Sequence, residues 1–431
     1  MTTKYMTQLN RSYDNQTKLM EQSDGAKIHR PSDGPINYSK FLRYSTSYGE
    51  NDQYQYNVKT AVSWMKNTDA ALVDMSDAMK TVVEKANQAQ GTNTDSDMQA
   101  IAREMMVMVE QCVSDANVQV NGRYLFSGQA DLIQPYTLSN DKYKRGETKT
   151  LDDKQAKFFG DTATQSGDMR QMLLMKGSDD KIYFLSTTTG KIYTQEFVDE
   201  GYKDKIAKDP DATVQPGDEV GKISGWSSSK DVAKYFDGRG VIKADNVSFE
   251  LEEGGTLKFE FSTLEQYIVT YQGDRKQFSM VKENGAAQPA TDTVNAGGVQ
   301  IAGCSIFDND DSGNEISGSN VFNDLLTVVA MCERGEKDGS RWMSSDGKTL
   351  ANNSFNTVNI AQTVVAARQQ IYTDCEEMLV TQSETILEDI TNVHSTDVAK
   401  LAVDMMTAQT IYQLSLSVGS RVIPPTLADY L

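Results

Sequence analysis

The feature that most constrains this chain is a series of small or apolar residues at alternating three- and four-residue steps between Val58 and Ala86. That spacing places the side chains on one stripe of a long α-helix, as in a coiled coil. No proline occurs between Pro35 and Pro135, so nothing in this stretch removes a backbone donor from a helix. We therefore predict one helix from about residue 39 to about residue 90, whose stripe needs partner helices along its length.

Two further stripes with the same spacing are candidate partners. The first follows a turn of Gly, Asn, Thr and Asp residues at 91–97 and predicts an antiparallel helical hairpin. The second lies at 360–393, in the other long proline-free block, and we expect it to pack against the first long helix. The residues that we expect to form this rod seam are Val58, Met65, Leu72, Met75, Met79, Val82, Ile101, Met105, Ile371 and Met378.

Weaker amphipathic ladders occur at both ends of the chain. The first has too few large apolar residues to be stable alone, and one pair of helices cannot offset the cost of ordering both. We therefore expect the two ladders to pair only when neighbouring subunits bury them. The first ladder should end near Asp24 and Gly25, and residues 395–397 should form a break and an N-cap before the second. The ladder residues are Met6, Leu9, Tyr13, Met20, Leu401, Met405, Ala408, Ile411, Tyr412, Leu414, Val418 and Val422.

Between residues 136 and 319 the helical periodicity fades and glycine becomes frequent. Alternating apolar residues predict three hairpins, with strands at 181–186 and 191–194, at 249–251 and 257–261, and at 268–271 and 278–281. Helix returns near Val321 and, after a Gly-rich pause, from about Asn356.

The predicted fold class is mainly α: a long helical coiled-coil bundle formed by both chain ends, with an inserted central β-rich domain. We expect the helical stripes to face each other and not the β region. The chain is divided into a terminal helical assembly domain (1–30 and 394–431), a helical rod domain (31–135 and 320–393) and a β-rich surface domain of one or two lobes (136–319).

The charge and the residue content exclude several classes of function. The formal net charge of -19 is opposite in sign to the charge that nucleic acids or anionic membranes attract. No window approaches the roughly 20 apolar residues of a membrane span, and no apolar secretory core occurs near residue 1. We therefore expect no nucleic-acid partner, no membrane anchor and no cleaved signal peptide.

The residues that could carry chemistry favour structural roles. His29 and His394 are the two histidines, which nearly excludes zinc sites and His-dependent catalysis. The cysteines lack a CxxC pair, and we expect free thiols, with Cys112 and Cys375 in helix cores. The acidic turn at 308–313 lacks the glutamate that a calcium loop needs at its twelfth position. We predict no cofactor, no metal site and no catalytic residues.

Three short motifs give the chain a resemblance to a known family. An elbow with two prolines follows the first ladder, a glycine-bounded segment follows the helical hairpin, and an Asp-Tyr-Leu triplet stands at 429–431. In this order and spacing they resemble the bacterial flagellin superfamily, and the first two favour its hook-filament junction members over filament flagellins. The turn at 271–274 also resembles a recurrent turn of the family's β region. The motif residues are Arg30, Pro31, Ser32, Asp33, Pro35, Gly122, Arg123, Tyr124, Leu125, Phe126, Gly128, Asp429, Tyr430 and Leu431.

This resemblance implies a structural subunit that self-assembles through its paired terminal helices and joins the flagellar hook to the filament. Its implied partners are further copies of itself in a ring or helical array, hook-associated protein 1, flagellin, and an export chaperone that holds the C-terminal helix. It also implies an extracellular position in the flagellum, reached by type III export. Three alternatives stay open: a flagellin-type filament subunit, an enzyme carried in the β insertion, and a coiled-coil adaptor.

Overall fold

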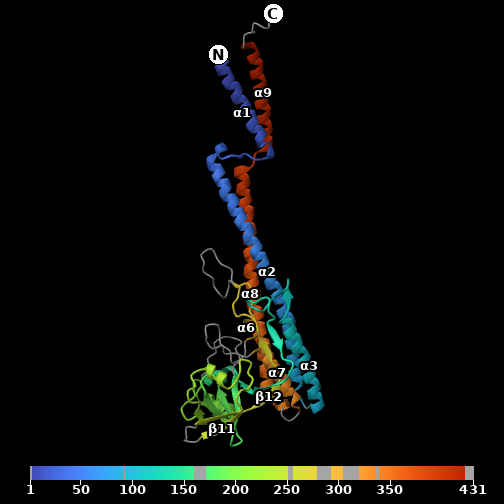
Figure 1. Ribbon diagram of the computed structural model, residues 1–431, viewed down its shortest axis with the longest axis vertical. Helices are drawn as coiled ribbons and strands as arrows, with labels where there is room; N and C mark the ends of the chain where they lie inside the picture. The colour runs from blue at the N-terminus through green and yellow to red at the C-terminus, as the bar shows by residue number, and fades with distance from the viewer. Residues whose placement is uncertain are drawn as a thin grey trace. The chain divides into compact units, whose positions relative to one another are not determined.

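The computed structural model describes residues 2–91, 93–159, 171–250, 256–278, 293–303, 320–335 and 339–422. It divides into two compact units, one of residues 1–60 and 372–431 and one of residues 61–371. Helices α2 (Pro35–Gln88) and α8 (Lys348–His394) each contribute to both units (Figure 1). The predicted fold class, long helices from both ends of the chain with an inserted β region, is confirmed. None of the predicted domain limits coincides with a limit of these two units, and the division into three domains stays a prediction.

The first unit is built from the two ends of the chain. Helix α1 (Thr2–Glu21) lies beside α9 (Val398–Val422) (Figure 1). The N-terminal part of α2 lies antiparallel to the C-terminal part of α8, since Asn51 of α2 bonds to Gln382 of α8.

In the second unit, four helices contribute most of the described residues of the main hydrophobic core. They are the C-terminal part of α2, α3 (Asp95–Asp115), α7 (Val321–Glu333) and the N-terminal part of α8. Helix α3 begins with a capping box, in which Thr94 and Asp97 each accept a hydrogen bond from the other's backbone N–H group. The helical hairpin predicted from the turn at 91–97 is therefore present.

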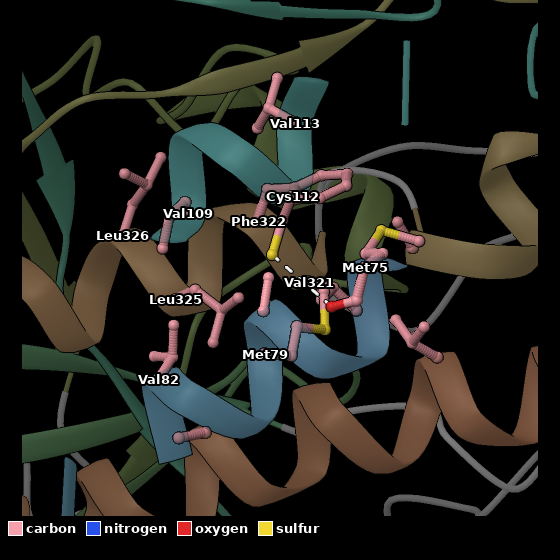
Figure 2. Packing of buried hydrophobic residues seen from close by; sticks show 14 of the residues in the cluster. Met75, Met79, Val82, Val109, Cys112, Val113, Val321, Phe322, Leu325 and Leu326 are labelled. Atoms are coloured by element: carbon pink, nitrogen blue, oxygen red, sulfur yellow. Dashed lines mark hydrogen bonds between the residues drawn. The ribbon is translucent and has the colours of Figure 1, made fainter. Parts of the chain in front are cut away.

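Side chains from these helices interdigitate closely. Figure 2 shows Met75 and Met79 of α2 facing Cys112 of α3 and Phe322 of α7. The Sγ atom of Cys112 lies 3.8 Å from the carbonyl oxygen of Met75, so the thiol touches the backbone of the neighbouring helix. Large apolar side chains packed at this density provide most of the stability of a helical bundle.

The rod seam predicted from the sequence is buried on α2 and α3 but not on α8. On α8, Ile371 and Met378 are exposed, and the residues that follow them, Tyr372 and Leu379, are buried instead. The prediction chose the face of α8 with the most aliphatic residues. The face that is buried is a different one, and it also carries Arg368. One residue corresponds to a rotation of roughly 100° about the helix axis, so this part of the prediction is wrong by one position. The buried seam residues are Val58, Met65, Leu72, Met75, Met79, Val82, Ile101 and Met105.

Helix α8 also begins earlier than predicted. It starts at Lys348 and not near Asn356, and it follows a π-helical turn, η6 (Met343–Gly347). The glycines of this stretch suggested a loop, but the chain is already helical there because Met343 and Leu350 are buried in the core.

The β region contains one larger sheet and three small strand pairs. The sheet has seven strands in the order β10-β11-β6-β7-β8-β9, with β5 also paired to β6, and every pairing is antiparallel. Its strands are β5 (Thr148–Thr150), β6 (Gln171–Gly177), β7 (Ile182–Ser186), β8 (Lys191–Thr194), β9 (Gly221–Lys222), β10 (Asn246–Glu250) and β11 (Thr256–Phe261). The small pairs join β1 (Gln119–Val120) to β2 (Arg123–Tyr124), β12 (Thr263–Gln266) to β4 (Tyr143–Gly146), and β13 (Val269–Tyr271) to β3 (Tyr136–Leu138).

Two of the three predicted hairpins are confirmed, β7 with β8 and β10 with β11. The third is not tested, because residues 279–281 of its second strand lie outside the described residues; its first strand, β13, pairs with β3, far away in sequence. Short helical segments connect the strands: α4 (Asp153–Phe158), the π-helical η3 (Phe197–Gly201), α5 (Tyr202–Lys208), η4 (Ser229–Lys234) and α6 (Gly298–Ala302).

Part of the predicted insertion belongs to the helical core. Tyr136, Val269 and Ile301 are buried in the same cluster as α2, α3, α7 and α8. The Tyr136 ring lies 4.8 Å from the ring of Phe322 on α7, edge to face. The expectation that the helical stripes face each other and not the β region is therefore wrong, since strands β3 and β13 fill one side of the bundle.

Candidate assembly surface

Helices α1 and α9 meet along a narrow face. The Tyr5 hydroxyl donates a hydrogen bond to the carbonyl oxygen of Ser415 at 2.7 Å. The Tyr5 ring also lies over Gly419, where any side chain would collide with it. Farther along the pair, the rings of Tyr13 and Tyr412 lie 6.1 Å apart. Because Gly419 has no side chain, the helices approach closely at this point.

The predicted ladders divide between this contact and the solvent. Leu401 and Ala408 are buried, and Leu9, Met405 and Tyr412 are half-buried. The other predicted residues of the ladders are exposed, namely Met6, Tyr13, Met20, Ile411, Leu414 and Val418, while the Val422 side chain lies outside the described residues.

On α1, the residues turned toward α9 are displaced from the prediction. Tyr5 and Leu19 are half-buried, whereas the neighbouring Met6 and Met20 are exposed. The pair also forms within one chain, so the expectation that the ladders pair only between subunits is wrong. Tyr5 and Gly419 were missed because neither extends the run of large apolar residues.

The outward face of the α1/α9 pair carries large apolar side chains. On α9, Met406 is 70% exposed and Leu414 is 60% exposed, and Val403 and Leu416 are also exposed. Together with the buried Leu401 on the inner face, they make α9 apolar around much of its circumference. A helix of this kind normally lies inside a larger assembly. The surface formed by Met6, Tyr13 and Met20 on α1 and by Val403, Met406, Ile411, Leu414, Leu416 and Val418 on α9 is called the outer terminal surface below.

Two connectors join this helical pair to α2 and α8, and backbone hydrogen bonds hold them together. The Lys27 N–H donates to the carbonyl oxygen of His394 at 2.6 Å, and the Thr396 N–H donates to that of Gly25 at 2.9 Å. The His394 ring stacks on Phe41 with centroids 4.1 Å apart. The two chain ends are therefore fixed to each other where α9 begins.

The elbow motif forms the N-terminal connector. Residues 31–33 make a 3-10 turn, η2 (Pro31–Asp33), which follows another 3-10 turn of the same length, η1 (Gln22–Asp24). A carboxylate oxygen of Asp33 accepts hydrogen bonds from the backbone N–H groups of Arg30 and His29, at 3.0 and 3.2 Å. These two bonds lower the pKa of Asp33, since they favour its charged form. Pro35 then begins α2, in the position where a helix tolerates proline.

The two histidines have structural partners in these connectors. The Nε2 atom of His29 lies 2.9 Å from a carboxylate oxygen of Asp24. The pKa of Asp24 is lowered, mainly by a hydrogen bond from the Ala26 N–H and to a smaller extent by His29.

At the break between α8 and α9, the Asp397 side chain accepts hydrogen bonds from the N–H groups of Ala399 and Lys400, at 3.0 and 3.1 Å, and so forms the predicted N-cap.

The second motif lies in the other unit and shapes a tight turn. Asn121 and Gly122 have φ angles of 53° and 77°, as a two-residue hairpin between β1 and β2 requires. Arg123 forms an ion pair with Asp131 at 2.9 Å, while Leu125 and Phe126 are buried in the helical core.

This motif also contacts the turn at 271–274, which the sequence singled out separately. The carbonyl oxygen of Phe126 accepts a hydrogen bond from the Tyr271 hydroxyl at 3.0 Å, and that of Ser127 accepts one from the Asp274 N–H at 2.9 Å. Gly128 has a φ of 66°, and a Cβ on it would lie 2.7 Å from the carbonyl oxygen of Lys276. The two motifs therefore form one joint, which sequence spacing could not reveal. The third motif, residues 429–431, lies outside the described residues.

A charged cleft is the most enzyme-like feature of the second unit. It has a volume of about 810 Å³ and lies where β5, α5, α7 and η6 come together. Lys149 forms an ion pair with Asp199, and Arg334 pairs with Glu147 at 2.5 Å. Burial lowers the pKa of Lys149 and raises that of Asp346. The described lining of the cleft contains neither histidine nor cysteine.

Other reactive groups are also poorly placed for chemistry. Burial raises the pKa of the Cys112 and Cys332 thiols to about 12, so both stay protonated and unreactive. Cys375 is half-buried on α8, and Cys304 and the acidic turn at 308–313 lie outside the described residues. Across the described residues, no group of His, Cys, Asp and Glu side chains could hold a metal ion. None of the described helices combines the length and the hydropathy that a bilayer span requires.

Comparison with known proteins finds similarity to flagellar proteins. Residues 1–131 match the family described as the bacterial flagellin N-terminal helical region. The resemblance predicted from the motifs is confirmed.

Two curated proteins that are similar to the chain are both named flagellar hook-associated protein 3. The chain is 30% identical over 154 residues to flagellar hook-associated protein 3 of Salmonella typhimurium, an alignment covering 34% of this chain and 49% of the relative. It is 28% identical over 128 residues to flagellar hook-associated protein 3 of Escherichia coli, covering 29% and 40%. The matched region thus spans about half or less of each relative's length.

Two solved structures of flagellar proteins are also similar to the chain. A putative flagellar hook-associated protein from Vibrio parahaemolyticus is 12% identical, with a TM-score of 0.42 over 84% of this chain and 100% of that one. The flagellar junction protein of Legionella pneumophila is 11% identical, with a TM-score of 0.37 over 82% and 99%.

Proposed function

We propose that this chain is a structural subunit of the bacterial flagellum, which self-assembles through α1 and α9 and joins the hook to the filament. The outer terminal surface carries the proposal: it places large apolar side chains in water on a helix pair built from both ends of the chain. Covering such side chains with further copies removes apolar area from water, which favours association by about 25 cal/mol for each Å².

The two curated relatives support the position within the flagellum, since both are named flagellar hook-associated protein 3. On this proposal the neighbours of the chain are further copies of itself, hook-associated protein 1 and flagellin. It reaches its extracellular site by type III export, with a chaperone on its C-terminal helix. The chain has no catalytic activity in this role, and its charged cleft is structural.

The test compares two neighbouring positions on α9. Leu414→Asp places a charge on the outer terminal surface, whereas Gln413→Asp adds the same charge at an exposed residue that is already polar. Because both side chains are exposed in the single chain, neither variant should shift its melting temperature by more than a few degrees. Leu414→Asp should nevertheless abolish incorporation onto isolated hooks, and Gln413→Asp should retain it.

Assembly is measured with purified protein, by electron microscopy of hooks before and after addition of flagellin. This removes chaperone binding and export from the readout. Normal incorporation of Leu414→Asp would show that the outer terminal surface is not an assembly contact. Long filaments formed by the wild-type chain without hooks would instead favour the filament-subunit alternative.

A further inference from the structure

The charged cleft of the second unit contains a lysine whose surroundings the proposed function does not explain. Lys149 lies on β5, and its side chain is 13% exposed. Its Nζ atom donates a hydrogen bond to Asp199 Oδ1 and lies 5.3 Å from the centre of the Phe184 ring. The ammonium group is therefore held against one carboxylate and one aromatic face, with little of the side chain in water.

Two π-helical turns border this cleft, and each contributes a carboxyl group. Asp199 lies on η3 and Asp346 on η6. Burial raises the pKa of Asp346, and the nearby charge of Lys149 opposes that rise. Turns of this kind are rare and are frequently found at functional sites. Lys149 thus interacts with one carboxyl group from the β region and with a second from the helical segment that precedes α8.

Most other charged groups of the cleft have partners of their own. Arg334 pairs with Glu147, and Lys203 lies 3.8 Å from Glu200. The Asp152 carboxylate caps the start of α4, where it accepts a backbone hydrogen bond at 2.7 Å. The cluster of one ammonium group and the carboxyl groups of η3 and η6 is therefore distinct from the surrounding ion pairs.

We propose that Lys149 and Asp199 react with each other to form an intramolecular isopeptide bond, an amide between their side chains, and that Asp346 relays a proton. A proton first passes from Nζ to the Asp199 carboxylate. The neutral amine then attacks Cγ of Asp199, and a C–N bond forms. Asp346 accepts a proton from the nitrogen and returns it to the leaving oxygen, so that a C–O bond breaks and one water departs. The ammonium carboxylate pair supplies all the atoms of the amide and of the water.

The surroundings favour each proton transfer. The first transfer turns two ions into two neutral groups, which shielding from water favours. Burial lowers the pKa of Lys149, although the charge of Asp346 opposes this shift, and a desolvated lysine amine is a nucleophile. The raised pKa of Asp346 brings its protonated form closer to neutral pH, as a group that both accepts and donates a proton requires.

Proximity favours the condensation itself. Reacting groups that a fold holds together reach effective concentrations of about 10⁵ to 10⁸ M. The amide would close a loop between two residues that are 50 positions apart and would tie β5 to η3. Such a cross-link restricts the unfolded chain, as a disulfide does. It does not depend on the proposed function, because all of its groups lie within one chain.

The experiment is mass spectrometry of the purified full chain, without hooks or flagellin. The wild-type chain should be lighter than its sequence by one water. Lys149→Arg should have the full mass of its own sequence, because arginine keeps the charge but does not form the amide. A tryptic digest of the wild type should contain a branched peptide that joins positions 149 and 199. A cyclic imide also loses one water, but it joins no second peptide.

Three variants test the parts of the mechanism. Asp199→Asn should release ammonia in place of water, and its product should have the same mass as the linked wild type. Asp346→Asn should stay largely unlinked. Lys205→Arg is the matched control, because Lys205 also pairs with a carboxylate, that of Asp218, and lies 5.5 Å from the Phe197 ring, but its side chain is 33% exposed. This variant should keep the loss of one water.

Three results would overturn the proposal or part of it. A wild-type chain with its full mass and no branched peptide would show that Lys149 and Asp199 form an ion pair only. A branched peptide that joins Lys149 to Asp346 would show that Asp199 is not the group attacked. Complete linkage in Asp346→Asn would show that Asp346 does not relay the proton. The digest of the wild type decides whether the bond exists even where a variant fails to fold, and it is separate from the assembly test.

Discussion

Replacing Leu72 by alanine tests whether the α2 seam is the core of the helical bundle. The Leu72 side chain is 0% exposed and lies in the cluster shared with α3, α7 and α8. Removing it loses the transfer free energy of the deleted carbons and leaves a cavity that a bundle with strands packed on one side cannot readily close. We expect the free energy of unfolding to fall by about 3 to 4 kcal/mol, in the middle of the usual range for Leu→Ala.

The matched control is Val73→Ala, the next residue of the same helix. Val73 is 39% exposed, and the higher helix propensity of alanine offsets part of the small loss of burial. Its expected effect is within about 0.5 kcal/mol. A large difference in destabilisation between these two adjacent positions is expected if only one residue in every three or four of α2 faces the core.

The assay is urea unfolding followed by tryptophan fluorescence in a Trp226→Phe background. Trp64 and Trp342 pack against the core that contains Leu72, whereas Trp226 belongs to a separate cluster in the β region. With a slope near 3 kcal/mol per molar urea, the expected loss moves the midpoint of the Leu72→Ala variant by about 1 M. Equal midpoints for the two variants would refute the assignment of Leu72 to the core.

Three further outcomes are expected. Gly128→Ala should destabilise the second unit by about 2 kcal/mol or more in a thermal melt, because alanine is strained at positive φ and its Cβ meets backbone carbonyl oxygens. Gly49→Ala, in open space on α2, should stabilise the protein by about 0.5 to 1 kcal/mol in the same measurement. Iodoacetamide at about pH 9 should alkylate Cys112 and Cys332 in the unfolded chain only, as judged by mass spectrometry, since burial raises their pKa to about 12. Because the folded-state pKa of these thiols is raised, their contribution to stability is complete below about pH 9 and should decline as the pH rises towards 12. Excising residues 136–319 should lower the melting temperature of the helical bundle markedly, because the deletion removes Tyr136, Val269 and Ile301 from its core; an unchanged melt would show that these residues add little.

The sequence determined the long helices and several of their ends, but not the start of α8, because local chemistry specifies the ends that carry capping residues or proline. The capping residues Thr94 and Asp397 and the proline at position 35 act through their own backbone neighbours. The same is true of the hairpin of β7 and β8, whose strands are separated by a short turn. The seam of α2 was also readable, since its apolar residues form one unambiguous stripe.

Tertiary structure decided which face of the other helices is buried. On α1 and α8 large apolar residues occupy adjacent faces, so Met6 competes with Tyr5, and Ile371 competes with Tyr372. Periodicity favours the stripe with more large aliphatic residues, but the buried face depends on the shape and the hydrogen bonds of the partner. Tyr5 faces inward because Gly419 leaves space for its ring and the carbonyl oxygen of Ser415 accepts a hydrogen bond from its hydroxyl.

Tertiary structure also decided which distant segments meet. The pairing of β13 with β3, the joint between the turn at 271–274 and Phe126, and the hydrogen bond from Asn51 to Gln382 each join residues far apart in the chain. A local pattern can show that a strand needs a partner or that a polar residue stands on an apolar stripe. It does not identify the partner, because that choice minimises the unpaired polar groups and the empty space of the whole fold.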